Sequence, residues 1–394
     1  MNFPMAPQNG EDRPKGLSSS NVQLMPTMAA AQAGGCAPPP DPMDAHQRPG
    51  YTLMSYVADF ISTPAGPVPR VHTRKNREDH WGTFLARTGI ERYHYRVVPG
   101  LYAVGSPTDQ SEVLVTANFK LTFDQVREAM DGYDAWILVL DTKGINVWCA
   151  AGKGTFATDE LAARIRSANL DQVVAHRRLI VPQLGATGVS AGGVKKQSGF
   201  RVVYGPIRCT DLPEYLDNQR RATPEMRQIT FTLWERFILT PVEVQITLKP
   251  ALITALILFI ISGFGPGFFS FSAALVRGFT AMGAMAAGIL AGAVAAPVLL
   301  PHIPVKEFAL KGIITGGVAA LLLILLLPAG AVGMAGAHAL LLFTIAISSF
   351  LAMNFTGTTP FTSPSGVEKE MKRYMPFQLV SLVLAAGLWI YAAF

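Results

Sequence analysis

The distribution of apolar residues along the chain constrains its fold more than any other feature. Five stretches of about 20 residues, the length that crosses the hydrocarbon core of a bilayer as a helix, lie beyond Lys249. They are residues 251–270, 279–300, 308–328, 333–353 and 377–394. The second stretch contains Gly288 and Gly292, a spacing of small residues that favours close helix packing. The sequence therefore predicts an α-helical transmembrane bundle of about five helices after a soluble domain.

Basic residues in the expected loops predict how this bundle is oriented. On one side, between stretches, lie Lys306, Lys311, Lys369, Lys372 and Arg373. The opposite side carries only Arg277. Because cytoplasmic loops carry the excess of Lys and Arg, we expect a multi-pass protein of the cytoplasmic (inner) membrane. The soluble domain precedes the first stretch, so it is expected to face the cytoplasm.

The first part of the chain divides into three segments. Residues 1–50 are rich in Pro, Gly, Ser, Gln and Met and are expected to be a disordered tail. Residues 51–222 are expected to fold as a cofactor-binding α/β domain. Residues 223–250 are an amphipathic linker, which either lies in the membrane interface or packs on the soluble domain. Residues 251–394 then form the transmembrane domain.

Within the second segment, strand and helix signals alternate. Short apolar runs predict strands at 112–118, 134–141, 179–184 and 200–204. Helices are expected from a capping box at Thr122 and Gln125, from Thr158, and over 212–218. This alternation predicts a Rossmann-like α/β fold with a parallel sheet. In such sheets ligands bind beyond the carboxyl ends of the strands.

Charge and cysteine content exclude some classes of protein. The formal net charge is +6, yet the densest basic run, residues 70–77 (RVHTRKNR), is not interleaved with aromatic residues. We therefore expect a membrane surface rather than nucleic acid as the partner, with the run itself most simply a solvated segment. The cysteines Cys36, Cys149 and Cys209 show no paired spacing, which fits free thiols in a reducing compartment.

The segment that carries chemistry is residues 141–153 (DTKGINVWCAAGK), directly after the expected central strand. A phosphate-binding loop is disfavoured because position 147 is Val and position 154 is Gly. A nucleophilic Cys149 would need a base, and the nearest histidine in sequence, His176, lies beyond the next helix. Two readings remain: a small buried hydrophobic cysteine, or an axial ligand to the metal of a planar cofactor.

A second motif, Gly188-Val-Ser-Ala-Gly192, fits the G-x-S-x-G elbow of serine hydrolases. An elbow needs a helix directly after the serine, and Gly192-Gly193 disfavours one. The later histidines, His302 and His338, both fall in the membrane half. We therefore do not expect Ser190 to be a nucleophile.

The stretch NVWCAAGK resembles the signature of the membrane-bound, mercury-methylating corrinoid protein (HgcA type), which is related to the large subunit of the corrinoid iron–sulfur protein. VTANFK at 115–120, LDTKGINVWCAAGKGTF at 140–156 and IVPQLGA at 180–186 also resemble that family, whereas 187–193 departs from it. The resemblance implies a cobalamin-like corrinoid, bound base-off, with the Cys149 thiolate as lower axial cobalt ligand.

The same resemblance implies roles for neighbouring residues. Cys149 would sit in a short helical cap that shapes the lower face of the cofactor site, formed by Asn146, Val147, Trp148, Ala150, Ala151, Gly152 and Lys153. Further contacts to the corrinoid side chains are expected at strand ends, from Thr116, Asn118, Gly185 and Gly205. A thiolate is a soft, strongly donating ligand, which favours delivery of the methyl group as a carbanion equivalent to a soft electrophile.

The implied function is methyl transfer to inorganic Hg(II), giving methylmercury. The implied partners are a small ferredoxin with [4Fe-4S] clusters as reductant, and a methyl-donor protein or methylated folate. Three alternatives stay open: a membrane-anchored methyl carrier of one-carbon metabolism for which mercury is incidental, a transporter with a nucleotide-sensing domain, and a pure anchor or scaffold.

Overall fold

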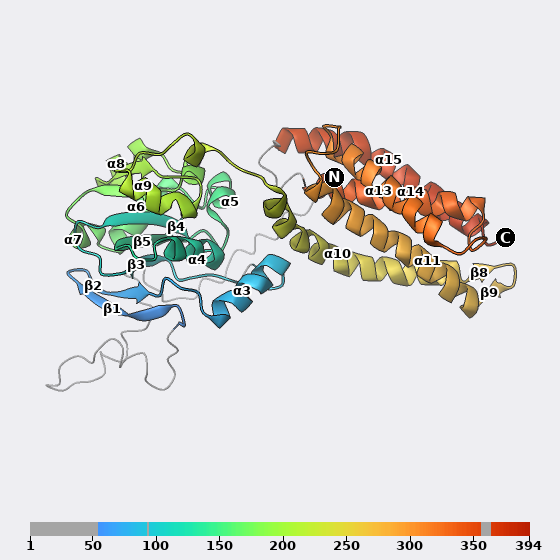
Figure 1. The fold of residues 1–394 in the computed structure, drawn as a ribbon, viewed down its shortest axis with the longest axis horizontal. Coiled ribbons are helices and arrows are strands. Elements are labelled where there is room, and N and C mark those ends of the chain that lie inside the picture. Colours follow the sequence, from blue (N-terminus) through green and yellow to red (C-terminus); the bar gives the residue numbers. More distant parts are fainter. Residues whose placement is uncertain (1–53, 93, 356–363) are drawn as a thin grey trace, which may run out of the picture. The chain divides into compact units, whose positions relative to one another are not determined.

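The computed structural model describes residues 54–92, 94–355 and 364–394, and the chain divides by its internal contacts into two units. The α/β unit comprises the described residues up to Thr83 together with those from 94 to Gln228. The helical unit comprises Phe84–Arg92 and the described residues from Ile229 to Phe394. The expected disordered tail, with Cys36, lies outside the described residues. Figure 1 shows both units.

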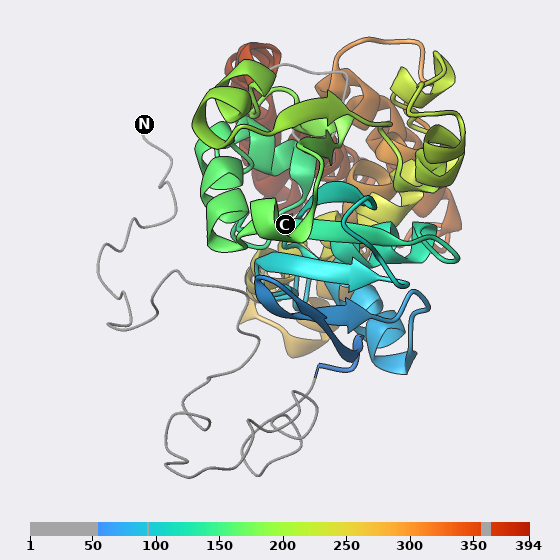
Figure 2. The same cartoon turned by 90° about the vertical axis from the view of Figure 1, so that its left-hand side faces the viewer.

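The α/β unit is built on a seven-stranded sheet, whose strands lie side by side in Figure 2. The strands are β1 (Val57–Thr63), β2 (Gly66–Val71), β3 (Gly100–Val104), β4 (Glu112–Ala117), β5 (Ala135–Leu140), β6 (Arg178–Val181) and β7 (Arg201–Tyr204), in the order β1-β2-β3-β5-β4-β6-β7. The four strands expected from sequence, β4 to β7, are present and mutually parallel.

The expectation of a parallel sheet is nevertheless only partly right, because the sheet is mixed. β3 pairs antiparallel with β5, and the β1–β2 hairpin extends the sheet beyond β3. The segment before residue 110 therefore supplies three strands. The expected strand at 179–184 is also shorter than predicted, because Pro182 is followed by a 3-10 turn at Gln183–Gly185.

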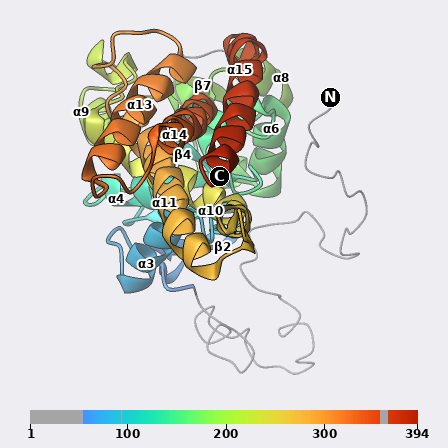
Figure 3. The same cartoon turned by 90° about the vertical axis from the view of Figure 1, so that its right-hand side faces the viewer.

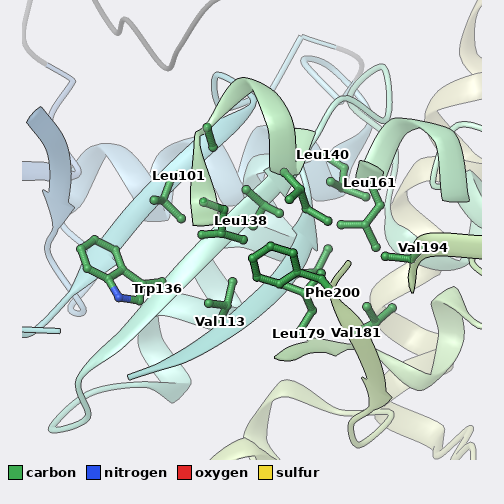
Figure 4. Close-up of a cluster of buried hydrophobic side chains, with 14 of the residues drawn as sticks. Leu101, Val113, Trp136, Leu138, Leu140, Leu161, Leu179, Val181, Val194 and Phe200 are labelled. Carbon is green, nitrogen blue, oxygen red and sulfur yellow. The ribbon is translucent and has the colours of Figure 1, made fainter. Parts of the chain in front are cut away.

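The central strand β5 is buried on both faces, and its side chains alternate between two cores. Trp136, Leu138 and Leu140 point into one core, drawn in Figure 4. Ile137 and Val139 point into the other. A strand covered by helices on both faces needs apolar residues at every position, because successive side chains point to opposite faces of the sheet.

Helices cover the two faces of the sheet. They are α4 (Lys120–Ala129), α5 (Val147–Gly152), α6 (Thr158–Ser167), α7 (Leu170–Val173), α8 (Ala191–Ser198) and α9 (Leu212–Asp217). A further helix, α3 (Arg77–Thr88), crosses the division between the units. Residues of α5, α6 and α8 contribute to the core in Figure 4, and those of α4 and α9 to the other. The expected capping box is wrong: α4 begins at Lys120, after an N-cap Phe119 that makes no side-chain cap.

A buried group of four charged side chains ties α3 to α4. Arg127 donates from Nη2 to Asp79 Oδ2 at 2.7 Å and from Nε to Asp124 Oδ1 at 2.8 Å. Lys120 pairs with the same two carboxylates. Arg127 also donates to the carbonyl of Arg74, within the basic run 70–77. The basic run is thus partly held against α4 rather than being a free cationic surface.

The helical unit contains five helices long and apolar enough to cross a membrane (Figure 3). They are α10 (Leu233–Ser262), α11 (Phe271–Leu290) continued through a π-helical turn (Ala291–Ala295) and α12 (Ala296–Val298), α13 (Phe308–Leu326), α14 (Met334–Asn354) and α15 (Pro364–Tyr391). A two-stranded hairpin, β8 (Phe264–Gly265) and β9 (Phe268–Phe269), joins α10 to α11. The number of helices expected from sequence is confirmed.

The residues expected to form a separate linker are part of the first of these helices. α10 runs without interruption from Leu233 to Ser262, so most of segment 223–250 and residues 251–262 of the first expected stretch form one helix. The expected span 251–270 is wrong at its end, where the hairpin β8–β9 follows. The Trp234 ring stacks on Phe237 at 5.6 Å and is 64% exposed. Its expected place in a membrane interface stays a prediction.

The close helix packing expected at Gly288 and Gly292 is confirmed. A Cβ atom on Gly292 would lie 2.5 Å from the carbonyl oxygen of Ser348 on α14. A Cβ atom on Gly288 would lie 3.0 Å from the carbonyl oxygen of Thr344. Only glycine lets the two helix backbones approach this closely.

Candidate functional site

The short helix α5 carries Cys149 and follows β5 through the loop Asp141–Asn146. A short helix is thus present where the sequence resemblance implied one, and its role as a cap on a cofactor stays a prediction. Asn146 is its N-cap, and its Oδ1 accepts a hydrogen bond from the backbone N–H of Cys149 at 2.9 Å. Val147, Ala150 and Ala151 are buried, so the helix packs on the sheet through one apolar side.

Cys149 and Trp148 lie on the opposite, exposed side of α5. Cys149 is a free, exposed thiol, and Trp148 is 38% exposed. Within the described part of the chain, the Cys149 sulfur has no hydrogen-bond partner. A Cβ atom on Gly152 or Gly154 would meet no atom within 4 Å, so the surface beside α5 is open. The reading of Cys149 as a small buried hydrophobe is therefore wrong.

Asn118, directly after β4, holds the loop that leads to α5. Its Oδ1 accepts from the backbone N–H of Thr142 at 3.0 Å, from Thr142 Oγ1 at 2.8 Å and from the N–H of Gly144 at 2.9 Å. Its Nδ2 donates to Asp141 Oδ1 at 3.3 Å. Asn118 is 4% exposed. Its side chain is thus engaged in fixing the loop; a contact to a corrinoid stays a prediction.

The loop Asp141–Asn146 contains two residues whose backbone lies in the left-handed region. Lys143 and Gly144 have φ angles of 60° and 76°, in the left-handed region. Lys143 Nζ also donates to Asp141 Oδ2 at 2.6 Å. Partial burial alone would raise the pKa of Asp141, but the hydrogen bonds and charge of Lys143 outweigh it and lower that pKa. The Asp141 carboxylate therefore stabilises the loop through its hydrogen bonds with Lys143.

The turn after β6, which contains Gly185 and Gly188, also packs against α5. A Cβ atom on Gly188 would lie 2.1 Å from the carbonyl oxygen of Phe156 and 3.0 Å from Ala151 Cα. A Cβ atom on Gly185 would lie 2.5 Å from the Phe156 ring. The expected residue Gly185 thus belongs to the packing around α5, and Gly188 was missed by sequence reasoning.

Two of the residues expected to contact the corrinoid, Thr116 and Gly205, lie on the other face of the sheet from α5, and their contacts to a corrinoid stay predictions. Thr116 is buried within β4, on the sheet face that Leu114 shares rather than on that of α5. Gly205 follows β7, and a Cβ atom there would lie 2.9 Å from Ile180, in the same second core. The structure therefore brings Asn118 and Gly185 to α5 but leaves Thr116 and Gly205 on the opposite face. Lys153, the C-cap of α5, is exposed.

The geometry argues against both nucleophile hypotheses, Cys149 with His176 as its base and Ser190 in a serine-hydrolase elbow. His176 precedes β6 and its Nε2 lies 2.9 Å from the carbonyl oxygen of Ser111, at the amino ends of the parallel strands, whereas Cys149 lies beyond their carboxyl ends. His176 is thus no base for Cys149. Ser190 is followed by α8, so the expectation that no helix begins there is wrong. Its hydroxyl is an N-cap that accepts from Gly193 N–H, and β6 ends nine residues before Ser190, at Val181, whereas an elbow serine follows its strand directly.

The residues present fit a cofactor that brings its own metal ligands. No group of three or more His, Cys, Asp or Glu side chains able to hold a metal ion occurs among residues 54–92, 94–355 and 364–394. A lone exposed sulfur can supply one axial position to a metal whose other positions a macrocycle fills. Next to that sulfur Trp148 is exposed, and a Cβ atom at Gly152 or Gly154 would meet no other atom within 4 Å, so these positions do not block the approach of a flat ring.

Comparison with known proteins finds a family similarity within the α/β unit. Residues 91–216 match the family described as CO dehydrogenase/acetyl-CoA synthase delta subunit. This range covers β3 to β7 and includes α5.

Individual relatives give the same result. The acetyl-CoA decarbonylase/synthase complex subunit gamma of Methanopyrus kandleri is 34% identical over 125 residues, 31% of this chain and 27% of the relative. The corresponding subunit of Archaeoglobus fulgidus is 32% identical over 124 residues, 31% of this chain and 26% of the relative. The chain thus spans about a quarter of the length of these curated relatives. The expected relation to the corrinoid iron–sulfur protein large subunit is supported, whereas the comparisons carry no mercury-specific signal.

Proposed function

We propose that the α/β unit binds a corrinoid through the Cys149 thiolate and passes a methyl group from it to inorganic Hg(II). The observation that carries the proposal is the exposed, unpartnered Cys149 sulfur at the carboxyl edge of the sheet. The NVWCAAGK signature supports both parts of the proposal, whereas the similarity to acetyl-CoA decarbonylase/synthase subunits supports only the corrinoid part. When bound, the corrinoid supplies a methyl group carried on cobalt.

The chain's own residues hold and present this site. Asn146 fixes the first turn of α5, and Asn118 fixes the loop before it, so the sulfur is positioned by two separate sets of hydrogen bonds. Trp148 offers a broad apolar wall beside the sulfur. We further propose a small [4Fe-4S] ferredoxin as reductant, a methyl-donor protein or methylated folate as donor, and insertion of the five apolar helices in the cytoplasmic membrane.

A second candidate is a membrane-anchored methyl carrier of one-carbon metabolism. The names of the relatives, which belong to acetyl-CoA decarbonylase/synthase complexes, favour it. The exposed cysteine is the feature that it leaves without a role.

One experiment separates the two functions. Membranes containing the full chain are supplied anaerobically with corrinoid, ferredoxin, methylated folate and Hg(II), and methylmercury is measured. We expect the wild type and Cys209→Ser to form methylmercury and Cys149→Ala to form none. A wild type that accepts a methyl group but never passes it to Hg(II) would leave the one-carbon carrier as the function.

A further inference from the structure

One end of the helical unit presents aromatic side chains to its surroundings. The hairpin β8–β9 and the C-terminal end of α15 lie together there, as Figure 1 shows. A Cβ atom on Gly265 would lie 3.6 Å from the carbonyl oxygen of Ala393. The most exposed rings are those of Phe268 (80%), Phe394 (76%), Tyr391 (71%) and Phe271 (64%). We call this set the aromatic end.

The loops of the aromatic end carry no acidic or basic side chain. Residues 263–270 and 327–333, all within the described chain, contain no Asp, Glu, Lys or Arg. The nearest cation, Arg277, turns inward: it donates to the carbonyls of Ser262, Phe264 and Trp389, and its guanidinium lies 4.9 Å from the Trp389 ring. His338 Nδ1 lies 2.7 Å from the carbonyl oxygen of Met334. The opposite end, by contrast, carries Lys306 and the charged first turns of α15.

The hairpin holds Phe268 in an unfavourable backbone conformation. Its φ is 71°, in the left-handed region that bulky residues avoid. Its ring contacts Phe264 edge-on at 5.7 Å and is otherwise directed outward. Packing inside the protein therefore offsets little of the cost of this conformation. Insertion of the Phe268 ring into an apolar environment outside the protein would offset the cost of this backbone conformation.

We infer that the aromatic end is seated in the interfacial layer of a lipid bilayer and does not emerge into water. The inference rests on the proposed membrane insertion. Phe, Tyr and Trp rings beside uncharged loops are typical of that layer. α13 and α14, with 19 and 21 residues, are each about 30 Å long, which matches the hydrocarbon thickness and leaves their connecting loop at its boundary.

A fluorescent label on single cysteines measures the depth of this end. In the full chain with Cys36, Cys149 and Cys209 replaced by Ser, an environment-sensitive label is attached at Phe268→Cys, at Val318→Cys near the middle of α13, or at Lys306→Cys. The protein is placed in phosphatidylcholine vesicles carrying a nitroxide quencher either near the headgroup or deep in the acyl chain. Tyr391→Cys is a second probe of the aromatic end in case Phe268→Cys does not fold.

The three positions have distinct expected results. The label at 268 or 391 should show blue-shifted emission and lose most of its fluorescence to the headgroup-level quencher. The label at 318 should lose most of its fluorescence to the deep quencher, and the label at 306 should be quenched by neither. If the labels at 268 and 391 behave like the label at 306 while the label at 318 is quenched, the aromatic end lies in water and the inference is wrong. If the label at 318 is also unquenched, membrane insertion fails and the inference with it. Neither corrinoid nor mercury is present, so the result is independent of methyl transfer.

Discussion

Asn118 and Thr142 are joined by two hydrogen bonds to a single oxygen, since Asn118 Oδ1 accepts from both the backbone N–H and the hydroxyl of Thr142. The pair connects the end of β4 to the end of β5. The same oxygen also accepts from Gly144. One side chain therefore sets the path of the backbone into the helix that carries Cys149.

Replacing Asn118 should loosen α5 without unfolding the sheet. Asn118→Ala leaves the N–H groups of Thr142 and Gly144 without an acceptor, and buried unsatisfied donors cost about 1–3 kcal/mol each. We expect the free energy of unfolding to fall by about 2–4 kcal/mol, and amide hydrogen exchange over residues 142–152 to become faster. Thr116→Ser, on the other sheet face, is the control. Unchanged exchange in Asn118→Ala would show that α5 is positioned by other contacts.

Glycine at position 188 should be required for the packing of α5, whereas glycine at 192 should not. A Cβ atom at Gly188 would overlap the carbonyl oxygen of Phe156, and one at Gly192 would meet open space. Gly188→Ala is expected to lower the melting temperature and to weaken corrinoid binding. Gly192→Ala lies in the first turn of α8 and should leave both measurements unchanged or slightly improved. Equal behaviour of the two variants would contradict this account of the turn.

The buried charges of α3 and α4 predict loss of stability in acid. Burial alone would raise the pKa of Asp79, but the hydrogen bonds from Lys120 and Asn76 and the charge of Arg127 outweigh it and lower that pKa. A folded-state pKa below the unfolded value of about 3.9 contributes stability above that pH, which is lost as the pH falls through the folded-state pKa.

Asp79→Asn tests this contribution by unfolding at several pH values. Because the change leaves Lys120 and Arg127 with one carboxylate fewer, the free energy of unfolding at neutral pH should fall by about 3–5 kcal/mol. Between about pH 5 and pH 3 the variant should lose less stability than the wild type. The same slope in both proteins would mean that Asp79 is not the group that titrates.

Close packing of α11 and its π-helical turn on α14 makes a paired prediction in the helical unit. In an ordinary helix Gly→Ala is favourable by about 1 kcal/mol. Gly292→Ala should instead lower the free energy of unfolding in detergent by about 1–3 kcal/mol, because its Cβ would overlap Ser348. Gly283→Ala, whose Cβ would have its nearest neighbour at 3.8 Å, should be neutral or stabilising. A stabilised Gly292→Ala protein would contradict the close approach.

Sequence patterns predicted the elements that depend on local signals or on a continuous apolar run. β5 was predictable because six consecutive residues are buried and apolar. The exposure of Cys149 follows from helical periodicity, since the apolar positions 147, 150 and 151 share one side of α5. The helix α8 was missed because two glycines disfavour it, yet the Ser190 cap and the burial of Val194 in the core outweigh that preference.

Contacts between distant segments were not predictable. Asn118 meets Thr142 and Gly144 only because β4 and β5 pair in parallel, 24 and 26 residues apart in sequence. The strands β1 and β2 lack a clear apolar pattern, and the short apolar run of β3 does not show that it pairs antiparallel with β5, so their addition to the sheet could not be predicted from sequence. Thr116 was placed correctly in a strand, but the face on which it lies depends on the register of that strand.

The attachment of Cys149 to cobalt is tested most directly by the absorption spectrum of the full chain purified anaerobically with corrinoid. If the proposed ligation holds, wild type and Cys209→Ser should share a spectrum that differs from that of free base-off corrinoid, because a thiolate ligand changes the absorption of cobalt. Cys149→Ala should retain less corrinoid or show the spectrum of the free cofactor. Identical spectra and equal corrinoid content in wild type and Cys149→Ala would contradict thiolate ligation and, with it, the proposed site.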